Sequence, residues 1–92
     1  MKFMVTWTCK TGSYKTAVEQ FLKTGGQPPK GMKTVGRWHV PGSIHGWHLL
    51  EGDDLTALAQ HAAEWANVID LEVNPVIEDA AAAEASERVF GK

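Results

Sequence analysis

The chain has 92 residues, which is the size of one domain and leaves no room for a second. Nine Lys and Arg residues against eleven Asp and Glu residues give a net charge of −2, so the basic face that a nucleic acid requires is not expected. The apolar fraction of 43% is too high for a disordered chain, and no apolar run approaches the roughly 18 residues of a membrane span. The sequence therefore predicts a single globular domain over residues 1–92, with neither nucleic acid nor a membrane as partner.

Residues 2–8 predict a strand, because β-forming side chains alternate there between two faces. One face carries Phe3, Val5 and Trp7, and the other carries Met4, Thr6 and Thr8. A turn that ends at the capping residue Ser13 leads into residues 14–22, where apolar side chains recur at helical spacing. The glycines at 25–26 should end this helix, and the prolines at 28–29 prevent its continuation.

Residues 32–40 and 43–51 predict two strands joined by a tight turn at Pro41-Gly42. If the hairpin closes at this turn, the numbers of opposed residues sum to 83. This register places Trp38 opposite His45, Gly36 opposite Trp47 and Val35 opposite His48. A bulge or an odd loop would shift the pairing.

The aspartates at 53–54 predict the start of a second helix, where a carboxylate can cap the first turn. Its expected apolar stripe consists of Leu55, Leu58, Ala59, Ala62, Trp65 and Ala66. Residues 68–77 alternate again, and Pro75 indicates an edge strand because proline cannot donate to a central ladder. The alanine-rich residues 78–90 favour a terminal helix with a thin apolar face, which we expect to pack on a surface.

This order of elements predicts an α+β fold, a ferredoxin-like βαββαβ sandwich with an extra C-terminal helix. Its four-stranded antiparallel sheet has both helices on one face and leaves the other face bare. Large side chains occur on both sides of the predicted hairpin, so the bare face needs a cover. A second copy of the chain can supply it, and we expect a homodimer formed sheet to sheet, a dimeric α/β barrel.

Several segments carry a resemblance to a known family. They are MKFMVTW at the start, the loop TGGQPPKG (24–31), VGRWHVPG (35–42), GWHLLEGDD (46–54), Trp65 and DLEVNPVIED (70–79). In these the chain resembles a small uncharacterised family, a domain of unknown function, within the dimeric α/β-barrel superfamily. The resemblance implies the fold and the dimer but no single reaction, because the superfamily includes cofactor-free monooxygenases, haem-degrading enzymes, lactone isomerases and haem peroxidases.

Arg37, His39 and His48 share one face of the predicted hairpin and form the best polar cluster in the chain. Two imidazoles beside a permanent cation suit a pocket, between sheet and helices, for an anionic or carbonyl-bearing ligand. In this interpretation His39 is the acid or base and Arg37 is the anion clamp. The alternative is structural: both histidines bond to the backbone, and Arg37 pairs with a carboxylate.

Aromatic side chains supply the other candidate ligand-binding residues. The set is Trp38, Trp47, His45 and Trp7, together with His48. Trp38 and Trp47 share a face as a diagonal cross-strand pair, and they line either a dimer interface or a pocket for a flat ligand. Trp7 also fits an ordinary core, as does Trp65 on the second helix.

Other chemistry has less support in the sequence. His45 and His48 point to opposite faces of a strand, and no acid is placed to complete a metal site, so we expect neither a metal nor a cofactor. A haem-degrading site would combine Trp47 with His61, but Thr6 and Thr8 stand where an Asn is expected, and His61 should lie at the solvent edge. The adjacent Lys10 could lower the pKa of Cys9 and make it reactive, but no general base can be assigned to it, so we interpret it as an incidental thiol.

The expected function is therefore that of a small-ligand-binding homodimer. Its enzymatic form is a cofactor-free monooxygenase- or isomerase-like activity on a small aromatic or carbonyl compound. The alternative is a non-catalytic, ligand-sensing or stress-associated binding module. The single cysteine excludes a disulfide within the chain, and the first residues lack the apolar run of a signal peptide, so we expect a cytoplasmic location.

Overall fold

The protein is described from a computed structural model, and the described part of the chain is residues 1–91. The elements follow one another as β1 (Lys2–Cys9), α1 (Tyr14–Thr24), β2 (Lys33–His39), β3 (His45–Glu51), α2 (Leu55–Trp65), β4 (Ile69–Val76) and α3 (Asp79–Phe90). The four strands form one antiparallel sheet in the order β2-β3-β1-β4. This is the ferredoxin-like arrangement with an added C-terminal helix that the sequence predicts, and β4 is an edge strand as Pro75 indicates.

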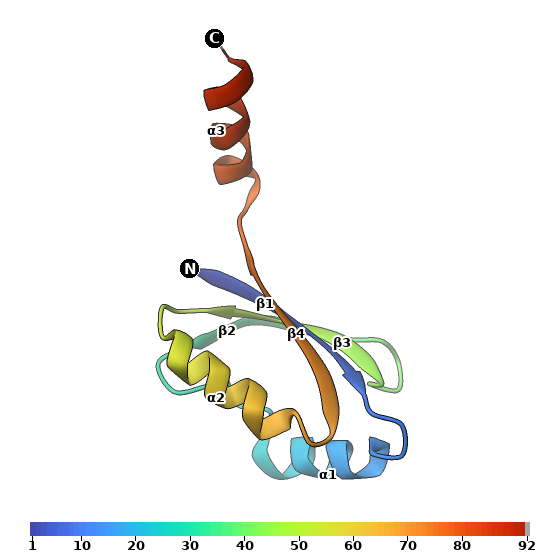
Figure 1. Cartoon of the computed structure of the whole chain (residues 1–92). Coiled ribbons are helices and arrows are strands. Elements are labelled where there is room, and N and C mark those ends of the chain that lie inside the picture. Colours follow the sequence, from blue (N-terminus) through green and yellow to red (C-terminus); the bar gives the residue numbers. More distant parts are fainter. Residues whose placement is uncertain (92) are drawn as a thin grey trace.

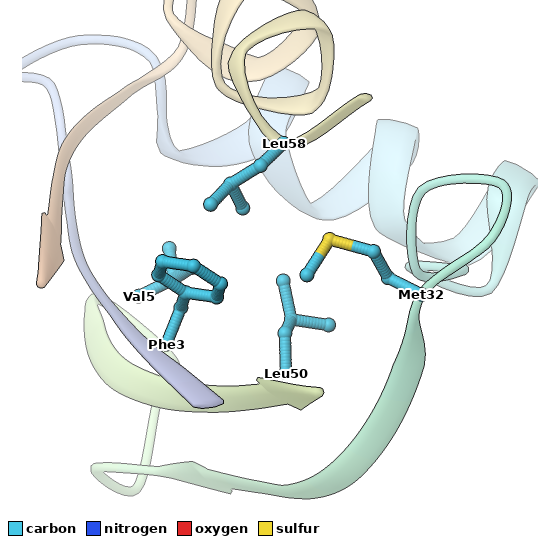
Figure 2. Close-up of a cluster of buried hydrophobic side chains, with 5 residues drawn as sticks. All are labelled: Phe3, Val5, Met32, Leu50 and Leu58. Atoms are coloured by element: carbon cyan, nitrogen blue, oxygen red, sulfur yellow. The ribbon is translucent and has the colours of Figure 1, made fainter. Parts of the chain in front are cut away.

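Helices α1 and α2 cover the same face of the sheet, and the other face has no helix on it (Figure 1). Alternation along β1 sends Phe3 and Val5 toward the helices, where both are buried. Leu50 of β3 is fully buried beside them. Leu58 of α2 lies above the cluster and Met32 of the loop before β2 enters from its right-hand side (Figure 2). This cluster fills one end of the space between sheet and helices. A smaller cluster of Ala17, Val68 and Ile69 lies at the other end.

The helix boundaries follow the predicted signals. Gly25 ends α1 in the left-handed conformation, with its N–H donated to the carbonyl of Phe21. Asp54 begins α2, and its side chain accepts a hydrogen bond of 2.9 Å from the N–H of Ala57. Ser13 occupies the N-cap position of α1 but makes no side-chain cap bond. Only the second helix therefore has a capping side chain at its start.

The register of the hairpin differs from the prediction. Trp38 lies opposite Trp47, Arg37 opposite His48 and His39 opposite Gly46, so the pairing sums to 85 and not to 83. The connection is longer than a two-residue turn, since Val40 bonds back to the carbonyl of His45. A second irregularity lies between Thr34 and Gly36, where Val35 is an extra residue in β2. Trp38 and Trp47 are thus a direct cross-strand pair and not a diagonal one.

The expectation that the terminal helix packs on a surface is wrong. α3 points away from the sheet, and the described chain measures 54 Å along its longest axis but 27 and 17 Å along the others (Figure 1). No residue of α3 is buried, and Val89 and Phe90 are largely exposed. An ion pair between Lys2 and Glu78 joins the base of this helix to β1. None of the helices in the described residues is long and apolar enough to cross a bilayer.

The cap of α2 provides a test of these assignments. We expect Asp54→Ala to lower the free energy of unfolding by about 1 kcal/mol, because the N–H of Ala57 loses its acceptor. The matched variant is Ser13→Ala, which removes no cap bond and should change stability by less than about 0.5 kcal/mol. Urea denaturation followed by circular dichroism measures both values. Equal losses for the two variants would contradict the assignment.

Candidate functional site

A cavity of about 260 Å³ lies between the helix-covered face of the sheet and helices α1 and α2. Most of its wall is apolar, from Val5, Trp7, Ala17, Val18, Phe21, Leu22, Trp65, Ile69 and Leu71. The polar side chains on the wall are Cys9, Arg37, His39, Ser43, His48 and His61. Arg37, His39, His48 and Trp7, four residues expected at a pocket, therefore lie around one space.

Arg37 is the half-buried cation of this cavity. Its Nη2 donates to the backbone carbonyl of Gly26, and its guanidinium carbon lies 5.4 Å from the centre of the Phe21 ring. Among residues 1–91 no carboxylate lies within ion-pair distance of it. Loss of water around the guanidinium lowers its pKa from the usual value. The structural alternative, in which Arg37 pairs with an acid, is therefore wrong for the described chain.

Gly26 has no side chain because Arg37 and Phe21 occupy that space. Its φ is +58°, and a Cβ built there would lie 2.8 Å from the guanidinium and 2.7 Å from the Phe21 ring. The hydroxyl oxygen of Thr24 accepts a hydrogen bond of 3.2 Å from the Gly26 N–H. The first residues of the TGGQPPKG loop thus hold the carbonyl that positions Arg37.

His48 is 4% exposed and lies against Arg37. Its Nε2 is 3.3 Å from Arg37 Nη2 and 2.8 Å from Thr34 Oγ1. An arginine can only donate, so Nε2 must accept, and the ring is neutral with its proton on Nδ1. Burial first, then the charge of Arg37 and the neighbouring His61, lower the pKa of His48 to about 4. The role of His48 is to hold the guanidinium rather than to carry a charge.

The bulge at Val35 makes this arrangement possible. Thr34 and Arg37 are three residues apart, and in a regular strand their side chains would point to opposite faces. The extra residue changes the alternation, so both side chains reach His48 on the helix-covered face. No residue of the hairpin predicts a bulge at this position. Thr34 is therefore absent from the predicted site residues.

His39 lies at the rim of the cavity and is exposed. Its ring meets Trp7 and Phe21 edge to face, at centroid distances of 5.1 and 5.7 Å. Trp7 lies over Gly46, where a Cβ would collide with its indole, and its Nε1 donates to the carbonyl of Ser43 at 3.3 Å. The aromatic edges fix the His39 ring while leaving its nitrogens open to solvent or to a ligand.

The other predicted ligand-binding residues do not join this cavity. Trp38, Trp47 and His45 lie on the helix-free face, since they alternate with Arg37, His39 and His48 along β2 and β3. Trp38 is 54% exposed and Trp47 is 37% exposed. His45 bonds to the hydroxyl of Thr8 at 2.8 Å and meets the Trp47 ring at 4.9 Å. A single pocket holding both tryptophans and His39 is therefore incorrect.

His61 is buried in α2, although the sequence predicts it at the solvent edge. It is 8% exposed, lines the cavity and lies with its ring centre 6.3 Å from that of His48, whereas a solvent edge was expected. Leu55, Ala59 and Ala66 of the predicted stripe are exposed instead. The buried face of α2 is Leu58, His61, Ala62 and Trp65, a spacing of three and four residues centred on the histidine. Burial lowers the pKa of His61, so its ring is neutral.

The remaining chemical candidates are not assembled. Burial raises the pKa of Cys9, and Lys10, which could lower it, is paired with Asp70 at 2.6 Å. Within residues 1–91 no three His, Cys, Asp or Glu side chains come together to hold a metal ion. Trp47 and His61 lie on opposite sides of the sheet and cannot flank one porphyrin.

The buried neutral His48 predicts a pH dependence of stability. The unfolded chain takes up a proton near pH 6.5, whereas the folded ring does so only near 4. The unfolded state therefore binds more protons between these values, and the free energy of unfolding should fall by at most about 3 kcal/mol as the pH drops from 7 to 4. Imidazole ¹⁵N NMR should show the neutral Nδ1–H tautomer of His48 at pH 7 and its protonation only near pH 4. Titration of His48 near pH 6.5 would contradict this assignment.

Comparison with known proteins gives a family but no activity. No curated protein and no solved structure matches the chain. A family model, described as a domain of unknown function (DUF3303), matches residues 1–90, almost the whole sequence. The resemblance to an uncharacterised family is thus confirmed, and the chain belongs to the DUF3303 family.

Proposed function

We propose that the protein is a homodimeric small-ligand-binding domain. Its ligand is a small aromatic or carbonyl compound with an acidic group, held in the cavity between sheet and helices. One observation carries this proposal: the guanidinium of Arg37 lies half-buried at the cavity with no carboxylate partner in residues 1–91. A cation taken out of water without a counter-ion is costly, and an anionic ligand offsets that cost.

The rest of the cavity specifies the body of the ligand. Trp7, Phe21 and Trp65 supply aromatic surface, and Val5 and Leu71 supply aliphatic surface. Pockets for small molecules combine such apolar walls with a few polar groups that fix orientation. A planar ring with one acidic group matches this combination.

In the enzymatic form of the proposal, His39 moves a proton. Its imidazole lies at the rim, where it can take a proton from a carbon next to a carbonyl group and return it elsewhere on the same molecule. Arg37 holds the oxygen on which negative charge develops. This is an isomerase-like reaction. In the monooxygenase-like reaction the same carbanion, formed from a CH2 group, adds dioxygen and takes up a proton to give a hydroperoxide. Loss of water then leaves a new carbonyl group on that carbon, so the substrate itself supplies the electrons that reduce the second oxygen atom.

The alternative is a non-catalytic binding module, and one observation favours it. The Nε2 atom of His48 is already committed to Arg37 and Thr34, so one of the two histidines predicted beside Arg37 serves to hold it. A ligand sensor needs the clamp but no proton carrier. The two forms differ in His39, whose replacement should abolish turnover but leave a sensor's ligand affinity nearly unchanged.

Thermal melting with a ligand panel tests the pocket. The panel contains small aromatic acids, quinones, flavonoids and haem. A ligand present at 100 times its Kd stabilises the folded state by about 2.7 kcal/mol, which raises the Tm of a domain this size by about 10 °C or more. We expect an aromatic acid to give such a shift, and Arg37→Ala to remove it. Arg88→Ala on α3, an exposed arginine paired with Glu84, is the control and should retain it.

The pocket proposal fails if no panel member raises the Tm of the wild-type chain, or if Arg37→Ala and Arg88→Ala respond alike. Equilibrium dialysis of folded Arg37→Lys separates charge from shape. A lysine keeps the cation but loses the fork that bonds Gly26 and His48, so affinity should fall without disappearing.

The dimer rests on the helix-free face of the sheet. Across its centre runs a row formed by Thr6, Trp47 and Trp38, and the adjacent row contains Met4 and Leu49. The Trp38 ring lies over Gly36, where a Cβ would meet it. Trp38 and Trp47 expose apolar surface on this face, and a second copy offers the same surface through a two-fold axis.

Light scattering tests the dimer. We expect a mass near twice 10.1 kDa at micromolar concentration. Trp47→Glu places a charge at the centre of the open face and should give a monomer, while Leu55→Glu, at an exposed position on α2, should remain a dimer. A wild-type monomer would show that the face is not an interface between copies.

A further inference from the structure

A second cavity, of about 330 Å³, lies between α1, the loop 24–31 and α2. Its character differs from that of the first. Three amide side chains, a hydroxyl group and one charge of each sign line it: Gln20, Gln27, Gln60, Thr24, Lys30 and Glu64. The TGGQPPKG loop supplies nearly half of its wall. In the proposed function this loop contributes only the carbonyl of Gly26, which holds Arg37.

The two cavities share a wall made of His61 and Trp65, since both residues line each of them. The His61 side chain is more than nine-tenths buried, and its ring makes no hydrogen bond within residues 1–91. In the described chain, every side-chain nitrogen that is fully buried has a hydrogen-bond partner. The nitrogens of His61 have none, so they must be accessible. The neutral His61 ring, which lines both cavities, thus has one donor and one acceptor that no described residue uses.

We propose that the two cavities are compartments of one site, and that its ligand is an aromatic acid carrying a neutral, hydroxyl-rich extension. The ring and acidic group occupy the apolar compartment with Arg37, as in the proposed function on which this inference rests. The extension passes His61 and lies among the glutamines.

The chemistry of the second compartment selects hydroxyl groups. Amides and a neutral imidazole each donate and accept, as a hydroxyl group does, so a polyol can satisfy them in several orientations. The charges of Lys30 and Glu64 cancel, which leaves no excess positive charge for a phosphate. Pro28, Pro29 and the Trp65 ring add flat apolar surface suited to the C–H faces of a sugar.

Internal bonds hold this compartment without using up its polar groups. Gln20 Nε2 bonds the carbonyl of Glu64 at 3.3 Å, which ties α1 to α2. Gln60 Nε2 is 3.3 Å from the Glu64 carboxylate, within the same helix. Gln60 is exposed on α2, so replacing it removes a hydrogen-bonding group without disturbing the core.

Matched ligand pairs test the inference by titration calorimetry. The probes are 4-hydroxybenzoate, 4-hydroxycinnamate and 6-hydroxy-2-naphthoate, each beside its β-glucoside. We expect at least one glucoside to bind the wild-type chain about tenfold more tightly than its parent acid. Gln60→Ala should cut that preference to about threefold or less while leaving the parent acid's Kd unchanged. Thr56→Ala, another exposed residue of α2 outside the cavity, should keep the full preference.

The outcomes separate this inference from the proposed function. If the parent acids bind but no glucoside gains affinity, or if Gln60→Ala weakens both members of a pair equally, the two-compartment site is wrong and the anion clamp stands. If none of the six compounds binds, the two-compartment site is wrong, and the thermal panel decides the anion clamp separately. Arg37→Ala should weaken both members of every pair, because the acidic group is common to them.

Discussion

The guanidinium of Arg37 is the group on which the site depends. It links four parts of the fold, since it comes from β2, donates to the loop carbonyl of Gly26, lies against Phe21 of α1 and contacts His48 of β3. A cation in this position dictates its surroundings. Together with burial, which is the larger cause, it lowers the pKa of the neighbouring imidazole. It also leaves no room for a side chain at Gly26 and gives an apolar cavity its charge.

The two faces of the sheet differ in what they carry: one bears the core and the cavity, and the other bears exposed tryptophans. The covered face packs Phe3, Val5 and Leu50 at one end and leaves a cavity at the other. The bare face presents Trp38 and Trp47, two of the four tryptophans in 92 residues. Strand alternation, and not a lack of room, turns both of them away from the core. The excess of tryptophan therefore belongs to the surface that we propose pairs with a second copy, and the cavity uses Trp7 and Trp65.

Much of the fold follows from short-range signals. Alternation in residues 2–8 and 68–77, glycine after α1 and Asp54 before α2 each act through local geometry, so the element order and the covered face of β1 could be predicted. The site was predictable only in part. The predicted hairpin register and the observed one differ by two residues. A shift by an even number leaves every side chain on the same face of the sheet, so Arg37 and His39 still share a face with His48.

What escaped prediction depends on contacts between distant elements. The sequence places His61 at the edge of α2 because Leu55, Ala59 and Ala66 shift the centre of the predicted apolar stripe away from it. Which side of α2 is buried depends on how the helix packs against the sheet. The direction of α3 is equally non-local, since its alanines favour a helix whatever lies beside it. For Trp38 and Trp47 the sequence leaves both a dimer interface and a ligand pocket open, because it does not show which face of the sheet the helices cover.

The extra residue at Val35 also bears on how relatives of this chain can be compared. A shared site needs the same number of residues between the threonine and the arginine as well as the same residues. Removal of one residue there restores regular alternation and turns either Thr34 or Arg37 toward the bare face. A family member with a one-residue gap in this strand would align well in sequence, yet its histidine would lose one of its two partners. The spacing within β2 is thus a better marker of the same contacts among Thr34, Arg37 and His48 than the identity of the tryptophans around them.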